Sequence, residues 1–256
     1  MGKSRTSTFD LENALRVDGY EFIIGIDEAG RGPLAGPVVA SAVCLKTLRV
    51  SLGHEVSKEL DLIKDSKMLS EKQRENIFDF ICENFYVGVG ICNHETIDRV
   101  NILEATYLAA KSAVSDLLRK INQEPRNNNQ KNHKTQITNS KQNTNHKTQT
   151  SRSIILFDGN KVIPNFSMDQ KAIVGGDKIV KSISAASIIA KVTRDRIMQE
   201  MHQKYPEYNF AKHKGYGTKA HFEMLQKHGP CEIHRKTFEP VKSLLARRSS
   251  LAKKRK

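Results

Sequence analysis

Apolar residues in this chain follow two patterns, one typical of strands and one typical of helices. Nearly continuous apolar runs at 22–26, 36–45 and 153–157 are typical of strands buried on both faces of a sheet. The run at 36–45 follows the first run closely enough to be its hairpin partner. Residues 85–92 alternate apolar side chains with glycine, which predicts another strand. A further short run at 172–177 predicts a strand that ends on an acid.

A helical period of 3.6 residues recurs between these runs. The predicted helices span 71–84, 95–121, about 184–204 and about 219–228, with shorter pieces at 9–15 and 240–247. Ser70 is a suitable N-cap for the helix at 71–84, and Gln73 completes a capping box with it.

Polar segments divide the chain into one large domain and three peripheral parts. Residues 1–20 are polar and predict a flexible N-terminal arm, whereas 21–245 hold the predicted strands and helices. Within them, 122–152 contain eight Asn and five Gln but a single large apolar residue, Ile137. Such a segment cannot bury enough apolar surface to offset the entropy lost on ordering, so we predict a disordered insertion. Residues 246–256 form a basic tail.

Charge and cysteine content bear on partners and compartment. The formal net charge is +14, and the insertion and the tail carry most of it. This excess supports a polyanionic partner such as nucleic acid, without locating a binding site. The four cysteines are scattered, which predicts reduced thiols in a cytoplasmic protein. No apolar run approaches the ~18 residues of a membrane span, and a monomer is the default expectation.

Acidic residues follow three of the predicted strands. Asp27 and Glu28 end the first, Asp158 ends the strand at 153–157, and Asp177 ends the last run. Strand ends at one edge of an open sheet converge, and ligands bind in the crevice outside them. Carboxylates gathered there favour Mg²⁺ or Mn²⁺, and two such ions about 3.5–4 Å apart clamp the attacking and leaving oxygens of a phosphodiester. The alternative is that each acid is a turn former or a helix cap, which suits any one of them alone.

Several longer motifs follow one another along the domain. The first is Ile-Asp-Glu-Ala-Gly-Arg-Gly-Pro-Leu-Ala-Gly-Pro at 26–37. The others are Asp65-Ser66-Lys67, Asp158-Gly159-Asn160, Gly176-Asp177, the runs at 184–195 and 213–218, and His234-Arg235-Lys236-Thr237-Phe238. Together they resemble the motifs of ribonuclease HII, the bacterial type 2 ribonuclease H, in the same order. The insertion and the basic tail depart from the family pattern, but both lie outside the motifs.

This resemblance implies a fold and a reaction. The fold is α/β and ribonuclease H-like, a mixed five-stranded sheet flanked by helices, with a helical C-terminal part. Asp27, Glu28, Asp158 and Asp177 are the implied catalytic carboxylates, and the first three are the implied ligands of Mn²⁺ or Mg²⁺. The implied enzyme hydrolyses the RNA strand of RNA–DNA hybrids and incises duplex DNA 5′ of a single ribonucleotide, leaving 3′-hydroxyl and 5′-phosphate ends. Its implied role is ribonucleotide removal during DNA replication and repair.

Selection of a ribonucleotide requires a group that reads the 2′-hydroxyl, because this group distinguishes RNA from DNA. In the family the Gly-Arg-Gly turn does so with backbone groups, which implies Gly30, Arg31 and Gly32 here. The family tyrosine that stacks on the following deoxyribose matches Tyr216, which lies between two glycines. A tyrosine buried in the core is the alternative interpretation of Tyr216.

Other charged residues of the motifs are interpreted from their sequence neighbours. Lys67 and Lys191 are expected phosphate contacts, although an exposed lysine is usually only solvated. Asp195 lies beside Arg194 and Arg196, which indicates a structural ion pair, so we place it outside the site.

Three other functions stay open from the sequence. Another nuclease or a transposase of the same fold would share the carboxylates but lack the Gly-Arg-Gly turn and the tyrosine loop. A type 3 ribonuclease H carries an extra N-terminal domain, for which we expect no room before Phe22. In a non-catalytic RNA-binding module the acids would be structural. Aromatic residues make up only 6% of the chain, with no tryptophan, which disfavours that module because it needs stacking platforms.

Overall fold

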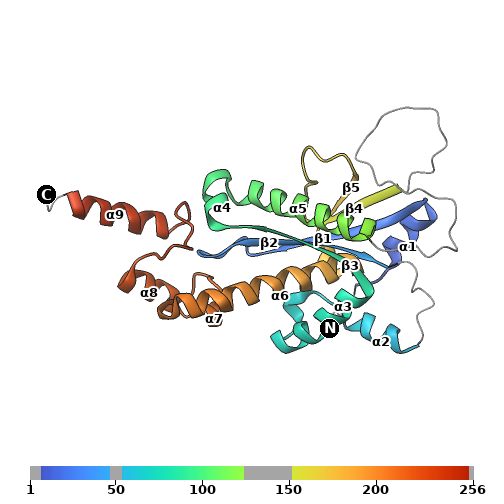
Figure 1. Cartoon of the computed structure of the whole chain (residues 1–256), viewed down its shortest axis with the longest axis horizontal. Helices are drawn as coiled ribbons and strands as arrows, with labels where there is room; N and C mark the ends of the chain where they lie inside the picture. Colours follow the sequence, from blue (N-terminus) through green and yellow to red (C-terminus); the bar gives the residue numbers. More distant parts are fainter. Residues whose placement is uncertain (1–6, 47–53, 124–151, 254–256) are drawn as a thin grey trace, which may run out of the picture.

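A computed structural model describes residues 7–46, 54–123 and 152–253. Most of the predicted insertion, from 124 to 151, lies outside the described residues. The chain forms a central sheet with helices on both faces (Figure 1). The strands are β1 (Tyr20–Ala29), β2 (Val38–Leu45), β3 (Phe85–Cys92), β4 (Arg152–Asp158) and β5 (Asp169–Ile173).

The five strands form one mixed sheet in the order β3-β2-β1-β4-β5. β1 lies at its centre and pairs antiparallel with β2 and parallel with β4, so that Ile26 lies opposite both Ala42 and Phe157. β2 and β3 are antiparallel, whereas β4 and β5 are parallel. The predicted mixed five-stranded sheet and the pairing of the first two strands are confirmed. Because β1 and β4 run in the same direction, their carboxyl ends lie at the same edge of the sheet.

Helices cover both faces of the sheet. α4 and α5 lie on one face, and α3 and α6 lie on the other (Figure 1). Among the described residues, no helix is long and apolar enough to span a bilayer. The α-helices are α1 (Asp10–Val17), α2 (His54–Leu62), α3 (Glu71–Asn84), α4 (His94–Val100), α5 (Ile102–Gln123), α6 (Lys181–Lys204), α7 (Phe210–His213), α8 (Lys219–His228) and α9 (Val241–Lys253), and 3₁₀ helices span Ser66–Met68 (η2), Gly176–Lys178 (η4) and Pro206–Tyr208 (η5).

Local sequence signals account for several of these elements. The predicted strand at 85–92 is β3, and the predicted helix at 71–84 is α3. The capping box of α3 is formed as predicted, because the Ser70 hydroxyl accepts from Gln73 N and the Gln73 side chain accepts from Ser70 N. These two bonds satisfy amides that the first turn of a helix leaves without partners.

Glycines allow the helices to lie very close to the sheet. A side chain at Gly88 or Gly90 of β3 would collide with the backbone of α5. Gly25 of β1 faces the start of α6, where a Cβ atom would lie 2.5 Å from Ile183 N. The positions of α5 and α6 against the sheet therefore depend on the absence of side chains at these three glycines.

A second, smaller core ties the C-terminal helices to the loop at 30–37, which joins β1 to β2. Leu34 and Ala35 of this loop are buried in it. They pack with side chains of α6, α8, α9 and the segments between them, which are Met198, Tyr208, Phe210, Leu225, Ile233 and Val241. This core confirms the helical C-terminal part and holds the loop next to the carboxyl end of β1.

The helix predicted at 95–121 is wrong in one respect, because it is divided into α4 and α5. Asn101 has a φ of 70°, in the left-handed region that asparagine adopts more readily than most residues. Its Oδ1 accepts from Leu103 N and Glu104 N at 2.9 and 3.1 Å, which caps the start of α5. The break follows from the asparagine rather than from the apolar pattern, which continues across it.

Element ends differ from the prediction at three further places. β5 ends at Ile173, and Gly175 turns the chain with a φ of 66°, so Asp177 lies in η4 rather than at a strand end. α6 begins at Lys181, earlier than the predicted start near residue 184. α9 continues to Lys253 and so includes most of the predicted basic tail.

The flexible arm predicted at 1–20 is wrong for the part that the structure describes, because residues 7–20 pack against the domain. Thr8 forms a parallel β-bridge with Val180. Glu12 of α1 is buried and accepts from the amide and the hydroxyl of Ser182 at 2.9 and 3.0 Å. This carboxylate therefore lies at the start of α6, where a helix favours negative charge.

Candidate active site

Three aspartates meet at the carboxyl edge of the sheet. Asp27 comes from β1, Asp158 from the end of β4 and Asp177 from η4. One carboxylate oxygen of each lies within 4.8 Å of the others. Asp27 and Asp177 are buried, and Asp158 is partly exposed. The sequence prediction that these acids converge is confirmed by this geometry.

Backbone amides hold two of these carboxylates in place. Asp27 Oδ1 accepts from Glu28 N, and Asp158 Oδ1 accepts from Gly176 N, each at 2.7 Å. The second bond fixes η4 against the end of β4. Asp177 follows Gly176 directly, so this bond also brings the third carboxylate to the cluster.

Burial and mutual repulsion make the cluster unfavourable in the absence of a cation. Burial raises the pKa of Asp27 well above its usual range, and the charges of Glu28 and Asp158 raise this pKa further. Burial raises the pKa of Asp158 as well, and the charge of Asp177 adds to this effect. A divalent cation between the carboxylates would relieve both the desolvation and the repulsion.

Glu28 lies beside the three aspartates rather than among them, because successive side chains of a strand point to opposite faces. Its Oε1 accepts from Arg31 Nη1 at 3.1 Å. Its Oε2 is buried and has no hydrogen-bond partner among the described residues. A carboxylate oxygen without a hydrogen-bond partner can coordinate a cation, so the four acids fit a hard divalent ion. The tight group nevertheless contains Asp177, whereas the predicted metal set contained Glu28 in its place.

The Gly-Arg-Gly turn faces the loop that carries Tyr216. A Cβ atom on Gly32 would lie 3.7 Å from Tyr216 Cε1. The tyrosine is 44% exposed, and the Arg194 guanidinium lies 5.8 Å from its ring centre, so the alternative of a core tyrosine is excluded. Gly30 has a φ of 98°, and a Cβ atom there would lie 2.6 Å from Pro37 O, so this position requires glycine.

Lys67 reaches the acidic cluster from η2. Its Nζ lies 3.1 Å from Asp177 Oδ2, and most of its side chain is exposed. Asp65 holds the backbone of η2, because its Oδ1 accepts from Lys67 N at 3.0 Å. The lysine therefore presents a positive charge at the opening of the cluster.

Lys191 is placed differently from the prediction. Its Nζ lies 2.6 Å from Asp195 Oδ1, one turn away on α6, and Arg74 also pairs with Asp195 at 3.7 Å. Asp195 is thus part of a structural ion-pair network, as predicted, but its partners are not Arg194 and Arg196. Arg194 donates to backbone carbonyls, and Arg196 pairs with a glutamate of α3.

Sequence reasoning missed three residues around the site. The hydroxyl of Ser187 of α6 opposes the rise in the pKa of Asp27, and its Oγ lies 2.8 Å from Ser66 Oγ. Arg235 donates to carbonyl groups of the Gly-Arg-Gly turn. All three lie inside the motifs, which were the only signal available, because a serine or an arginine does not by itself indicate what it contacts.

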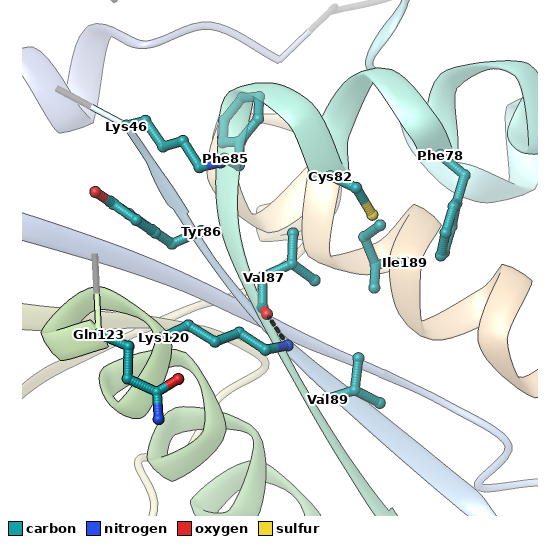
Figure 2. Close-up of a pocket in the computed structure, with 10 residues that line it drawn as sticks. All are labelled: Lys46, Phe78, Cys82, Phe85, Tyr86, Val87, Val89, Lys120, Gln123 and Ile189. Carbon is teal, nitrogen blue, oxygen red and sulfur yellow. Dashed lines mark hydrogen bonds between the residues drawn. The ribbon is translucent and has the colours of Figure 1, made fainter. Parts of the chain in front are cut away.

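A pocket of about 500 Å³ lies at β3, an edge strand of the sheet, and none of the four acids lines it (Figure 2). Figure 2 shows Lys120 of α5 donating to Val87 O of β3, at 2.8 Å. Asp116, one turn earlier, accepts from Val89 N at 3.2 Å. These two side chains occupy backbone groups that an edge strand would otherwise offer to another strand. Of the residues that the structure describes, no acidic one lines the pocket, so it does not resemble a metal site.

Comparisons with known proteins match most of the chain to one family. The family model for ribonuclease HII matches residues 24–241. Ribonuclease HII of Caldicellulosiruptor bescii is 44% identical over 93% of this chain and 95% of its own length, and that of Fusobacterium nucleatum is 46% identical over 90% and 88%. Among solved structures, ribonuclease H2 from Pyrococcus horikoshii OT3 has a TM-score of 0.58 and 26% identity, over 88% of this chain and 98% of that chain.

Proposed function

Because this chain belongs to the ribonuclease HII family, we propose that it incises duplex DNA on the 5′ side of an embedded ribonucleotide. Family membership makes the chain a metal-dependent endoribonuclease that degrades RNA in RNA–DNA hybrids. The proposed products carry 3′-hydroxyl and 5′-phosphate ends. The proposed role is ribonucleotide removal during DNA replication and repair, by a monomeric enzyme in the cytoplasm.

The observation that carries this proposal is the close group of Asp27, Asp158 and Asp177, with the orphaned oxygen of Glu28 beside it. We assign these four as the catalytic carboxylates and as the residues that hold Mg²⁺ or Mn²⁺. Their donor atoms are all oxygens, which suits these ions better than zinc. Two bound ions would supply charge neutralisation at the phosphate and hold the attacking and leaving oxygens in line.

The protein's own groups orient the acids and the substrate. Gly176 N donates to Asp158 Oδ1. This bond fixes the orientation of the carboxylate and therefore also the position of its second oxygen. Lys67, exposed beside Asp177, is positioned to contact a phosphate of the cleaved strand. Lys191 would have to leave Asp195 before it could contact a phosphate, so its proposed role in binding is the weaker of the two.

We assign selection of the ribonucleotide to two facing elements, which we call the 2′-hydroxyl reader: the turn formed by Gly30, Arg31 and Gly32, and the side chain of Tyr216. The short distance between Gly32 and the tyrosine ring supports this assignment. No described residue accepts a hydrogen bond from the amides of the turn, so these groups are available to a ligand. The exposed ring of Tyr216 can stack on the sugar that follows the ribonucleotide.

The test is cleavage of a DNA duplex that contains one ribonucleotide, with Mg²⁺ or Mn²⁺ and with chelator, beside an all-DNA duplex. We expect metal-dependent incision 5′ of the ribonucleotide and an intact control. Cleavage of both duplexes would contradict the 2′-hydroxyl reader but retain the metal site. Binding without cleavage under either metal would overturn the enzymatic assignment.

A further inference from the structure

Arg235 is fully buried, yet its guanidinium hydrogen-bonds to backbone carbonyls and to no carboxylate among the described residues. Its guanidinium donates to Gly30 O at 2.5 Å, Arg31 O at 2.9 Å, Gly36 O at 3.0 and 3.1 Å and Pro37 O at 3.2 Å. These carbonyls begin and end the loop at 30–37. A buried charge that forms no ion pair costs desolvation relative to an apolar side chain, so the main contribution of the arginine is the geometry of this loop.

The contacts of Arg235 also determine which way the turn presents its amides. In a trans peptide, the C=O of one residue and the N–H of the next point in opposite directions. The carbonyls of Gly30 and Arg31 point inward to the guanidinium. The N–H groups of Arg31 and Gly32 therefore point away from the guanidinium, and Gly32 itself lies beside the Tyr216 ring.

His234, which precedes Arg235 in the chain, is linked to Tyr216, the other half of the 2′-hydroxyl reader. His221 Nδ1 lies 2.9 Å from Tyr216 O, and because a carbonyl can only accept, this nitrogen carries the proton. His221 Nε2 must then accept, and it receives Nε2–H of His234 at 3.0 Å. His234 Nδ1 accepts in turn from Cys231 N at 3.0 Å. The chain of bonds fixes both tautomers and ends on the backbone of Tyr216.

Further bonds join the two halves directly. Leu34 N, in the loop at 30–37, donates to Gly215 O in the Tyr216 loop at 2.8 Å. Arg194, also fully buried, donates to Ala35 O in the first loop and to Lys214 O in the second, at 3.1 and 2.9 Å. The two loops are therefore held as one unit.

We propose that His234 and Arg235 are positioning residues that set both halves of the 2′-hydroxyl reader from one place in the chain. This inference rests on the proposed function of that site. Both side chains are fully buried, and Arg235 acts through backbone carbonyls whereas His234 acts through His221, so we place neither in contact with substrate. Their replacement should impair recognition of the ribonucleotide while the carboxylate cluster keeps its metal.

The test compares Arg235→Lys and His234→Asn with the wild-type protein. Lysine keeps the charge but lacks the planar fork that serves several carbonyls. Asparagine can still accept from Cys231 N but lacks the Nε2–H donor to His221. We expect kcat/KM on the single-ribonucleotide duplex to fall about a hundredfold in each, because a misplacement of about 1 Å has that effect. Amide hydrogen exchange should accelerate at 30–32 in Arg235→Lys and at 213–218 in His234→Asn, whereas Mn²⁺ binding measured by calorimetry stays unchanged.

Leu117→Ala is the matched control, because Leu117 is fully buried in α5 on the opposite face of the sheet. It should lower the melting temperature without changing exchange in either loop or kcat/KM, when all proteins are assayed well below their melting temperatures. The inference is overturned if Arg235→Lys keeps the wild-type kcat/KM, or loses no more than Leu117→Ala. If Arg235→Lys does not fold, His234→Asn is compared in the same way. The inference is then overturned if His234→Asn keeps the wild-type kcat/KM or loses no more than Leu117→Ala.

The wild-type assay separates failure of this inference from failure of the proposed function. If the wild-type protein incises at the ribonucleotide and both variants do so equally well, only the inference is lost. If the wild-type protein cleaves no ribonucleotide substrate, the proposed function is lost. The exchange rate of the turn in Arg235→Lys still decides whether Arg235 positions it.

Discussion

Lys67 Nζ lies 3.1 Å from Asp177 Oδ2, although 110 residues separate the two in the sequence. The lysine side chain is 76% exposed and the aspartate side chain 3% exposed, so the ion pair lies at the opening of the acidic cluster. A cation that belongs to the protein is thus placed next to the carboxylates that we assign to a divalent ion. The two cations compete for the negative charge of Asp177.

Removing this lysine should therefore strengthen metal binding while it weakens substrate binding. In Lys67→Met we expect the Mn²⁺ concentration for half-maximal activity to fall, by about fivefold at most, because an exposed ion pair contributes about 0.2–1 kcal/mol. The KM for the ribonucleotide duplex should rise. The half-maximal Mn²⁺ concentration and the KM are measured by titrating activity with Mn²⁺ and with the DNA substrate. Lys178→Met is the control, since it removes an exposed lysine next to Asp177 that is not paired with it. Equal effects in the two variants would contradict the specific role of the ion pair.

Asp158→Asn should raise the stability of the metal-free protein while it lowers turnover. The amide oxygen can still accept from Gly176 N, so we expect η4 to stay in place. The loss of one like charge should raise the free energy of unfolding in chelator by about 1 kcal/mol, or about 2–4 °C in melting temperature. Turnover should fall by orders of magnitude, because a charged ligand is lost. Near-normal turnover in this variant would contradict the assignment of Asp158 to the metal.

The buried histidine pair should make folding sensitive to acid. Burial lowers the pKa of His221 to about 4 and that of His234 to about 3, whereas an unfolded histidine has a pKa of about 6.5. Below pH 6.5 the unfolded chain takes up protons that the folded chain does not, so the free energy of unfolding falls as the pH is lowered. At pH 5.5 the expected loss is about 1.4 kcal/mol for each histidine. His213, stacked on His221 at 4.5 Å, has a lowered pKa and acts in the same direction.

This dependence is measured best as a difference between variants, because Asp27, Glu28 and Asp158 have raised pKa values and contribute the opposite trend. Urea unfolding of the wild-type protein and of His234→Asn, in chelator between pH 7.5 and 5, isolates the histidine contribution. The variant should lose less stability over this range. Identical slopes would contradict the assignment of buried neutral histidines.

The close contact of α5 with β3 should be intolerant of added volume. Gly90→Ala would drive a methyl group into the α5 backbone, and overpacking of this kind costs about 1–3 kcal/mol. Gly32→Ala serves as the stability control, because its Cβ atom would meet Tyr216 at an ordinary 3.7 Å. Chemical denaturation should show a lower midpoint for Gly90→Ala than for Gly32→Ala. A reversed order would mean that α5 can move away from the sheet without loss.

The sequence predicted those features that depend on neighbouring residues. β3 and the capping box of α3 follow from local periodicity and from Ser70 and Gln73, and the structure confirms them. The break at Asn101 was missed because the apolar period continues across it, although its side chain prefers to cap. The partners of Asp195 were missed because Arg74 lies far away in the sequence and reaches it only in the folded chain.

The same limit applies to the site. The convergence of Asp27 and Asp158 could be predicted, since acids at the ends of parallel strands meet at one edge. The place of Asp177 within the tight group depends on the bond between Gly176 and Asp158, which no local pattern reveals. The partners of Arg235 could not be predicted either. They are backbone carbonyls, which every residue has, so the residue types do not indicate them.

The separation of 205 residues between Gly30 and Arg235 has a consequence for how the molecule is assembled. Contacts so distant along the chain close a very large loop, and such contacts are slow to form. A ribosome synthesises all four carboxylates well before it reaches His234 and Arg235. The turn at 30–32 is made early, but it can gain its contacts with the Arg235 guanidinium only after most of the domain has been synthesised. The final arrangement of this turn is therefore expected late in the folding of the chain.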